Sequence, residues 1–511
     1  MNDKPIGLNR RDLLTAVLAA GTAPAFIRNA RAQDLPRFAL GIASGQPQAD
    51  RVVLWTMLTG PDLPSDVAVS WELAEDETFL RIVARGVELA RAGDAHSVHA
   101  EPDGLKPARW YWYRFRSLGQ TSAVGRTRTA PAADAVVDRF DFAITSCQRW
   151  DAGHFAAWRH AAAENLDVVM FLGDYIYEYA SSTQSLRQTQ GGLVRTLADY
   201  RQRYAQYKTD PALQAAHAAC PWLLVWDDHE VDNDYATLQG QSLQPDFATQ
   251  RAAAYRAYWE FMPFPKAARP VDGAMRIYGR LDWGRLARIH LLDDRQYRDV
   301  QSCPRPNRGG SNTVRLRECP DLCDPKRTLL GAAQEQWLTE GWSLDQPWNL
   351  LAQQTLMARF SWEDPSSSGQ GMYWTDGWDG YAPSRNRLLG VVAERKVPGV
   401  VVLGGDVHAN YVADLKADYD DAKSPVMATE FCGTSISSLG LDQSRVDAAS
   451  KFNPHIHHAR ADKRGYIKLS LSAKELRADL RELRNALQID SDIATGSSWI
   501  VDAAKPGARK A

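Results

Sequence analysis

The stretch that most constrains the fold is residues 171–179, which follow the short apolar run 167–170. A β-branched run that stops at Gly173 and Asp174 is typical of a buried parallel strand whose carboxyl end opens into a loop. In open α/β sheets, ligands bind at this end of the strands. Asp174 supplies a hard carboxylate and Tyr177 a phenol three residues later, a pair that suits trivalent iron. The alternative interpretation is that Asp174 caps the following helix and the tyrosines pack in the core.

Composition and charge favour a globular protein with no general affinity for polyanions. The chain has 511 residues, of which 44% are hydrophobic and 24% charged, enough for two or three domains with a core of normal size. Its 60 basic and 62 acidic side chains give a net charge of -2. This balance gives no reason to expect nucleic acid or an anionic membrane as a partner.

The first 33 residues differ in composition from the rest of the chain. Arg10 and Arg11 precede a weakly apolar stretch at 15–27, and a small-x-small cleavage signal follows at 30–32. This segment resembles a twin-arginine export signal, which implies a passing contact with the twin-arginine translocase and a periplasmic or secreted protein. The alternative is a basic, partly disordered N-terminus. The apolar stretch is too short for a permanent membrane anchor, and no later segment approaches about 20 apolar residues.

Two periodicities divide the remaining chain. Residues 36–131 carry short alternating strands, clearest at 51–56, 67–72 and 109–115, and predict a small all-β sandwich similar to a fibronectin type III domain. A linker at 129–134 follows. Residues 137–495 alternate strands with helices and predict a layered α/β domain with helices on both faces of a sheet.

The α/β region is expected to contain the following elements. Strands are predicted at 140–145, 166–172, 222–226, 349–352, 400–403, 428–432 and within 464–480, antiparallel strands near 275–292, and helices near 153–164, 195–218, 248–260, 332–342 and 385–394. After about Thr495 the composition indicates only a Gly-, Lys- and Ala-rich tail.

Four of the predicted strands end in residues of metal-binding type. These ends are 145–148, 173–178, 226–234 and 404–410, and together they contain Cys147, Asp174, Tyr177, Asp228, His229, Asp406 and His408. Parallel strands of one sheet end on the same side, so we expect these side chains to meet in one cleft.

The six cysteines fall into two groups. Cys303, Cys319 and Cys323 lie in a Pro-, Arg- and Asn-rich loop, where at least one local disulfide is expected in an oxidising compartment. Their spacing leaves open which two join. Cys147, at the end of a strand, is not assigned to a disulfide.

The motifs at these strand ends resemble one family. Gly-Asp-x-x-Tyr at 173–177, Asp-His-Glu at 228–230 and Gly-Asp-x-His at 405–408 are similar to the calcineurin-like metallophosphoesterase pattern, specifically the PhoD-like alkaline phosphatases and phosphodiesterases. Segments 41–47, 54–56, 293–298 and 430–437 resemble further blocks of that family. The resemblance implies a layered metallophosphoesterase sandwich domain behind the small all-β domain, and a site with Fe(III) and Ca(II).

The ligand types fit those two metals. A Cys147 thiolate and a Tyr177 phenolate are strongly donating and favour ferric iron, whereas a site rich in carboxylate favours calcium. We therefore assign iron to Cys147, Asp174, Tyr177 and His408, and calcium to the shared Asp174 with Asp228 and Asp406. A second calcium near Asn233 is a weaker expectation.

Two further residues are assigned catalytic roles. Arg295 is the candidate for a bidentate phosphate clamp, the alternative being a surface ion pair with Asp293 or Asp294. The resemblance implies that His229 hydrogen-bonds the substrate or protonates the leaving group. Gln353 and Gln354 also end a strand but receive no role.

These assignments lead to one main functional hypothesis. It is an exported alkaline phosphatase that releases inorganic phosphate from small phosphate monoesters. A phosphodiesterase of phospholipase D type on the same site is the alternative within hydrolases, and a metal-binding or adhesion protein is the alternative outside them.

Overall fold

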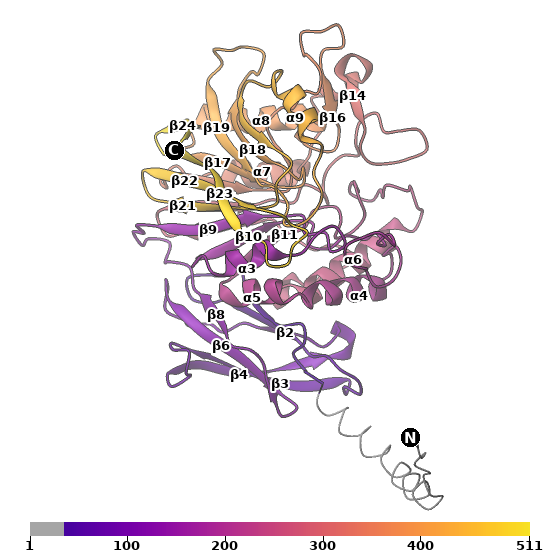
Figure 1. Cartoon of the computed structure of the whole chain (residues 1–511). Coiled ribbons are helices and arrows are strands. Elements are labelled where there is room, and N and C mark those ends of the chain that lie inside the picture. The colour runs from indigo at the N-terminus through magenta and orange to yellow at the C-terminus, as the bar shows by residue number, and fades with distance from the viewer. Residues whose placement is uncertain (1–34) are drawn as a thin grey trace, which may run out of the picture.

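The computed structural model describes residues 35–511, so the predicted signal segment at 1–33 lies outside the described residues. A small all-β part lies at the N-terminal end, and a larger α/β part is stacked on it (Figure 1). Within residues 35–511, no helix combines the length and the apolar character needed to cross a bilayer.

The N-terminal part is a sandwich of two sheets. One sheet contains β3 (Asp66–Ala74), β4 (Ile82–Arg91), β6 (Trp110–Ser117), β7 (Gln120–Thr121) and β8 (Gly125–Arg128); facing it are β1 (Ile42–Gly45), β2 (Val53–Met57) and β5 (Ser97–Ala100). Alternation along β3 buries Val67, Val69 and Trp71 between them. The predicted all-β class is confirmed.

A ten-stranded sheet forms the first layer of the larger part. Its central strands β9 (Phe140–Thr145), β10 (Val168–Leu172) and β11 (Trp222–Val225) are parallel, and β11 continues into β1, β2 and β5 of the sandwich. On the other side lie the antiparallel strands β21 (Gly465–Leu471), β22 (Glu475–Leu483), β23 (Ile493–Asp502) and β24 (Lys505–Lys510).

A seven-stranded sheet forms the second layer. Its strands are β12 (Gly279–Trp283), β13 (Ala287–Leu291), β15 (Trp348–Ala352), β17 (Val400–Gly404), β18 (Asn410–Lys416), β19 (Val426–Cys432) and β20 (Ile456–Arg460). The run β13, β15, β17 and β19 is parallel, and β12 pairs antiparallel with β13 as predicted. A separate pair joins β14 (Thr313–Arg315) to β16 (Met372–Trp374).

The two large sheets pack face to face, and helices cover their outer faces. One buried cluster joins Phe142 and Ile144 of the first sheet to Leu350 and Val401 of the second. On the outer faces lie α3 (Ala156–Ala162), α4 (Leu197–Lys208), α5 (Pro211–Ala219) and α6 (Phe247–Phe261) over the ten-stranded sheet, and α7 (Gly331–Gly341), α8 (Ala382–Arg395) and α9 (Gln443–Ser450) over the other (Figure 1). Short 3₁₀ turns lie at Ala92–Asp94, Lys266–Ala268, Leu316–Glu318, Pro320–Cys323 and Trp378–Tyr381.

The layered α/β class is confirmed, but the expectation of one sheet was wrong. Buried parallel strands of both sheets are short apolar runs of the same kind, and such a run carries no information about which sheet it joins. The predicted tail after Thr495 was also wrong, because β23 and β24 extend the first sheet to Lys510. Only Trp499 and Val501 of β23 are core residues, too few to give a strand signal in the sequence.

The expected local disulfide is confirmed. Cys303 and Cys319 are bonded, which closes the loop that precedes α7. The other four cysteines of the described chain are free; Cys323 is exposed, whereas Cys147, Cys220 and Cys432 are buried.

A buried lysine lies at the junction of the two parts. The Lys208 side chain is 1% exposed, and its Nζ lies 4.2 Å from the centroid of the Trp55 ring of β2. Nζ has no hydrogen-bond partner among the described residues, and burial lowers the pKa of Lys208 to about 7. The ammonium form therefore destabilises the folded state, and the cation–π contact offsets only part of that cost.

We predict that Lys208→Met removes a pH-dependent penalty. The folded pKa lies below the unfolded one, so between about pH 7 and pH 10.5 the unfolded chain binds the extra proton and stability rises with pH. Relative to the variant, the wild type should gain on the order of a few kcal/mol of unfolding free energy from pH 7.5 to 10. Urea unfolding at several pH values measures this, with Lys266→Met, whose side chain is 53% exposed, as the control. A difference that does not change with pH would contradict the assignment.

Candidate metal centre

The site is built from loops that follow parallel strands of both large sheets. Cys147 follows β9, Asp174 follows β10 and Asp228 follows β11, whereas Asp406 and His408 follow β17 of the second sheet. The expectation that all four strand ends belong to one sheet was therefore wrong, although the side chains do converge. They converge because the carboxyl ends of both parallel sets lie at one rim, where a parallel bridge joins the segments around residues 146 and 435.

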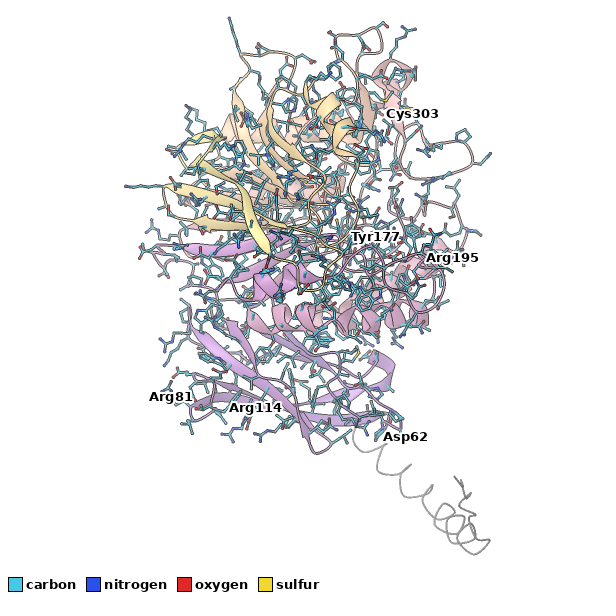
Figure 2. The ribbon with its side chains drawn as sticks, viewed as in Figure 1. Asp62, Arg81, Arg114, Tyr177, Arg195 and Cys303 are labelled. Carbon is cyan, nitrogen blue, oxygen red and sulfur yellow. A yellow bond between two sulfur atoms is a disulfide. The ribbon has the colours of Figure 1, made fainter. Side chains whose placement is uncertain are left out.

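All six predicted metal ligands lie together at this rim. Ligand atoms of Cys147, Asp174 and His408 lie within 4.8 Å of one another, and so do those of Asp174, Asp227, Asp228 and Asp406. Tyr177 closes the first group, since its hydroxyl donates to Asp174 at 2.7 Å and lies 3.1 Å from Nε2 of His408. Asp174 thus belongs to both groups, as the predicted bridging ligand requires, and Tyr177 lies where the loops of the two sheets meet (Figure 2).

Four of these residues have a backbone conformation that side chains rarely adopt. The φ angles are 59° at Cys147, 60° at Asp174, 63° at Asp406 and 55° at His408. Each left-handed non-glycine residue costs roughly 1–2 kcal/mol, so the surrounding structure must hold it in place. Strain of this kind, repeated at four members of one cluster, is typical of a functional site.

Glu230 provides much of that support. Its buried carboxylate accepts hydrogen bonds from the backbone N–H groups of Asp174 at 3.1 Å, Tyr175 at 2.5 Å and Asp227 at 2.8 Å. It therefore ties the loop after β10 to the loop after β11. Glu230 is part of the Asp-His-Glu motif, but its positioning role was not predicted.

Gln354 ties the next pair of loops. Its side-chain amide donates to the carbonyls of Trp226 and Leu292, both at 2.9 Å, and its oxygen accepts from the Asp294 N–H at 3.1 Å. Its polar atoms are thus bonded to backbone, which makes Gln354 a positioning residue.

The carboxylates of the site need more positive charge than the chain supplies. Asp174, Asp227 and Asp228 are buried and Asp406 is partly buried, and each has one carboxylate oxygen without a hydrogen-bond partner in residues 35–511. Burial raises the pKa of Asp174 and of Asp227 well above the usual range, and it raises that of Asp406 to about 7 against the opposing effect of Arg295. Unpaired, clustered, buried oxygens of this kind fit a hard cation such as calcium.

The sulfur and phenol donors also fit a cation. Burial, followed by the charge of Asp174, raises the pKa of both Cys147 and Tyr177 well above the usual values. The thiol and the phenol therefore stay protonated beside these acids unless a cation takes their place as the counter-charge. Thiolate, phenolate, carboxylate and imidazole together suit Fe(III).

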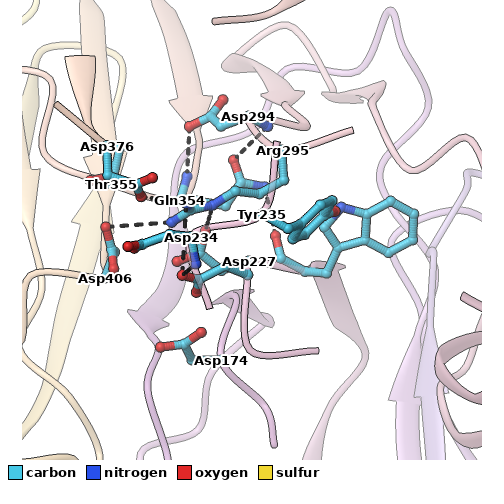
Figure 3. A network of polar contacts seen from close by, with 12 residues as sticks. Asp174, Asp227, Asp234, Tyr235, Asp294, Arg295, Gln354, Thr355, Asp376 and Asp406 are labelled. Atoms are coloured by element: carbon cyan, nitrogen blue, oxygen red, sulfur yellow. Dashed lines mark hydrogen bonds and ion pairs between the residues drawn. The ribbon is translucent and has the colours of Figure 1, made fainter. Parts of the chain in front are cut away.

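Arg295 is enclosed within the acidic cluster. Its side chain is 1% exposed, so the surface ion pair with Asp293 or Asp294 was wrong. Its Nε donates to Asp227 and its Nη1 to Asp376 at 2.5 Å, and its Nη2 lies 3.6 Å from Asp406 (Figure 3). The guanidinium is enclosed by carboxylates and acts as their internal counter-charge, which leaves the clamp role without support.

The arginine that faces open space is Arg149. It lines a polar cavity of about 720 Å³ together with Tyr179, His229, Asn233 and His408, among others. Its guanidinium carbon lies 5.7 Å from the centroid of the Tyr177 ring, and its Nε donates to Asp151 at 2.7 Å. No strand-end pattern marks Arg149, although it lies two residues after Cys147.

His229 is oriented by an acid. Its Nδ1 donates to Glu178 at 2.6 Å, and its ring lies 4.1 Å from that of Tyr177 between centroids. Burial alone would lower the pKa of His229, but Glu178, Asp174 and Asp228 together raise it well above the usual value. The ring thus keeps Nε2 available at the wall of the polar cavity.

A third acidic group adjoins the first two. Ligand atoms of Asp228, Asp234 and Asp376 lie within 4.8 Å of one another. Asp234 directly follows Asn233, near which a second calcium was predicted. However, Arg298 and Gln301 already donate to Asp376, at 2.7 and 2.6 Å. Asp376 lies in an irregular loop that no strand pattern marks, which is why the sequence did not reveal it.

Comparisons with known proteins agree with this geometry. The profile of the family described as PhoD-like phosphatase matches residues 142–480, and that of its N-terminal domain matches residues 21–131. Alkaline phosphatase D of Bacillus subtilis (strain 168) is 41% identical over 491 residues, which are 93% of this chain and 82% of that protein. The solved structure of PhoD superposes with a TM-score of 0.86 at 40% identity, over 93% of this chain and 92% of that one.

The chain therefore belongs to the PhoD-like phosphatase family, as the motifs predicted. This membership makes it a phosphoric ester hydrolase.

We predict that Gly173→Ala disables the site. Gly173 has a φ of +106°, and an added Cβ would overlap Asp227, lying 2.7 Å from its backbone nitrogen. Asp174 and Asp227 must then shift, so kcat/KM for ester hydrolysis should fall by about 100-fold or more.

The matched control is Gly192→Ala, where an added Cβ meets nothing within 4 Å. It should keep activity within about twofold, as expected of a surface substitution. Equal activity of the two variants would show that this loop does not set the geometry of the site.

Proposed function

We propose that the chain is an exported alkaline phosphatase that hydrolyses phosphate monoesters through a binuclear Fe(III) and Ca(II) site. The observation that carries the proposal is the meeting of Cys147, Asp174, Tyr177 and His408 in one group and Asp174, Asp228 and Asp406 in another. The same donor types in the same order form the family motifs, and the family is one of phosphatases. Arg10 and Arg11, with the cleavage signal at 30–32, support export.

The residues divide between the two metals by donor type. Cys147, Tyr177 and His408 would hold iron, Asp228 and Asp406 would hold calcium, and Asp174 would be shared. When bound, such a pair of cations supplies positive charge for the phosphate oxygens and lowers the pKa of a bound water.

The chain's own groups position and neutralise the substrate. Arg149 lies at the polar cavity and can donate to phosphate oxygens, and a guanidinium suits that geometry. His229, held through Nδ1 by Glu178, presents Nε2 on the same side and can donate a proton to the departing alcohol. Arg295 forms ion pairs with several of the carboxylates and so helps to hold them together. Their oxygens without a hydrogen-bond partner belong to the same cluster.

The reaction class is tested by comparing two substrates. Protein supplied with Fe(III) and calcium should release p-nitrophenol faster from p-nitrophenyl phosphate than from bis-p-nitrophenyl phosphate, by about tenfold or more in kcat/KM. A preference for the diester would overturn the monoester assignment in favour of a phosphodiesterase. If neither ester is hydrolysed, the proposed phosphatase activity is wrong.

The metal assignment is tested by composition and colour. We predict that Cys147→Ala loses most of its iron and the visible charge-transfer band of a ferric thiolate and phenolate site, whereas removal of calcium by a chelator stops turnover reversibly and leaves iron bound. Elemental analysis and absorption spectra measure both effects. Cys220→Ala, another buried free cysteine, is the matched control and should keep its iron. Equal iron loss in both variants would place the iron elsewhere.

A further inference from the structure

A second cavity adjoins the metal centre and shares two lining residues with the polar cavity. It holds about 550 Å³, within the range of small-molecule sites, and Asp406 and His408 form part of its wall. His408 and Leu439 line both cavities and so stand between them. The metal centre therefore faces two spaces of different character.

Five aromatic side chains line the second cavity, together with aliphatic residues such as Leu356, Met372 and Leu441. Rings of Trp362, Phe360 and Tyr411 follow one another, with centroids 4.8 Å and 5.5 Å apart, and Trp374 and Trp378 complete the wall. Tyr411, three residues after His408, lines the same cavity as His408 and Asp406. We call this space the aromatic cavity.

The polar side chains of the aromatic cavity are Asp406 and His408 at its metal end, and Thr313, Asp379 and Arg445 elsewhere along the wall. Asp406 has an oxygen without a partner in the described chain, and His408 turns its Nδ1 to the carbonyl of Leu439 at 2.7 Å. Asp379 lies farther along, but its oxygens already accept from the Phe360 N–H at 2.8 Å and from Arg385 at 2.7 Å. Arg445 has its guanidinium carbon 5.6 Å from the centroid of the Trp362 ring. A flat apolar substituent in the cavity would stack on the aromatic rings.

From this arrangement we propose that the aromatic cavity binds the organic substituent of the substrate and selects phosphate esters that carry an aromatic group. The inference rests on the proposed function, because it places the phosphoryl group at the metal end. The anionic phosphoryl group of such an ester would lie next to the cations. Its aromatic substituent would lie among the tryptophan rings. Small polar esters such as glycerol phosphate would leave the apolar surface of the cavity exposed to water. They would therefore gain little binding free energy from it.

Trp374 is the best residue for the test. It is half-buried on the short pair β14 and β16, outside the two large sheets, so its removal should leave the metal centre folded. Trp374→Ala should lower the ratio of kcat/KM for 2-naphthyl phosphate to that for glycerol phosphate by about tenfold or more. Trp374→Phe, which keeps an aromatic ring, should restore most of that ratio.

The matched control is Trp337→Ala. Trp337 is also half-buried, but it lies on α7 against Tyr278 and Arg280, and it lines neither cavity. This variant should keep the wild-type ratio. An unchanged ratio in Trp374→Ala, or an equal fall in both variants, would overturn the inference.

A binding measurement separates this inference from the proposed function. Metal-loaded wild type should bind 2-naphthylphosphonate at least about tenfold more tightly than methylphosphonate, and Trp374→Ala should lose that difference. If neither ester is hydrolysed but the binding difference appears, the phosphatase proposal fails and the aromatic subsite stands. If both esters are hydrolysed and no binding difference appears, the subsite fails and the phosphatase stands.

Discussion

The structure depends on a concentration of buried negative charge where two sheets meet. Asp174, Asp227, Asp228 and Asp406 lie together, and Arg295 is the cation enclosed among them. Carboxylates this close raise one another's pKa and resist burial unless positive charge is present. The Arg295 guanidinium satisfies part of that demand, and the remaining oxygens without a hydrogen-bond partner mark candidate positions for further cations.

The architecture explains how such a cluster is held. Each large sheet offers the carboxyl ends of parallel strands, and packing the sheets face to face brings both sets of ends to one rim. Left-handed backbone at Cys147, Asp174, Asp406 and His408 then turns the side chains inward. Buried hydrogen bonds to the Glu230 carboxylate hold this strained backbone in place. The conformational strain of the site is therefore offset by the rigid layers around it.

The sequence revealed which side chains cluster better than it revealed the framework that holds them. Cys147, Asp174 and Asp406 follow apolar runs with Gly or Ser beside them, a pattern that marks strand ends whichever sheet the strand joins. The division into two sheets depends on long-range pairing, such as β17 beside β15 and β19, which a single run does not encode. β23 was not predicted for a related reason: most of its residues are exposed or half-buried, so its sequence resembles that of a polar tail. The alternative surface ion pair of Arg295 was wrong because its neighbours in sequence, Asp293 and Asp294, are not its partners in space.

The central claim is that residues from the two sheets share the bound metals. The most direct test is anomalous diffraction at the iron edge from crystals of metal-loaded protein. We predict one strong iron peak beside Cys147 and Tyr177, and a weaker peak from a lighter cation beside Asp228 and Asp406. An iron peak away from Cys147, or metal bound by residues of one sheet alone, would contradict it.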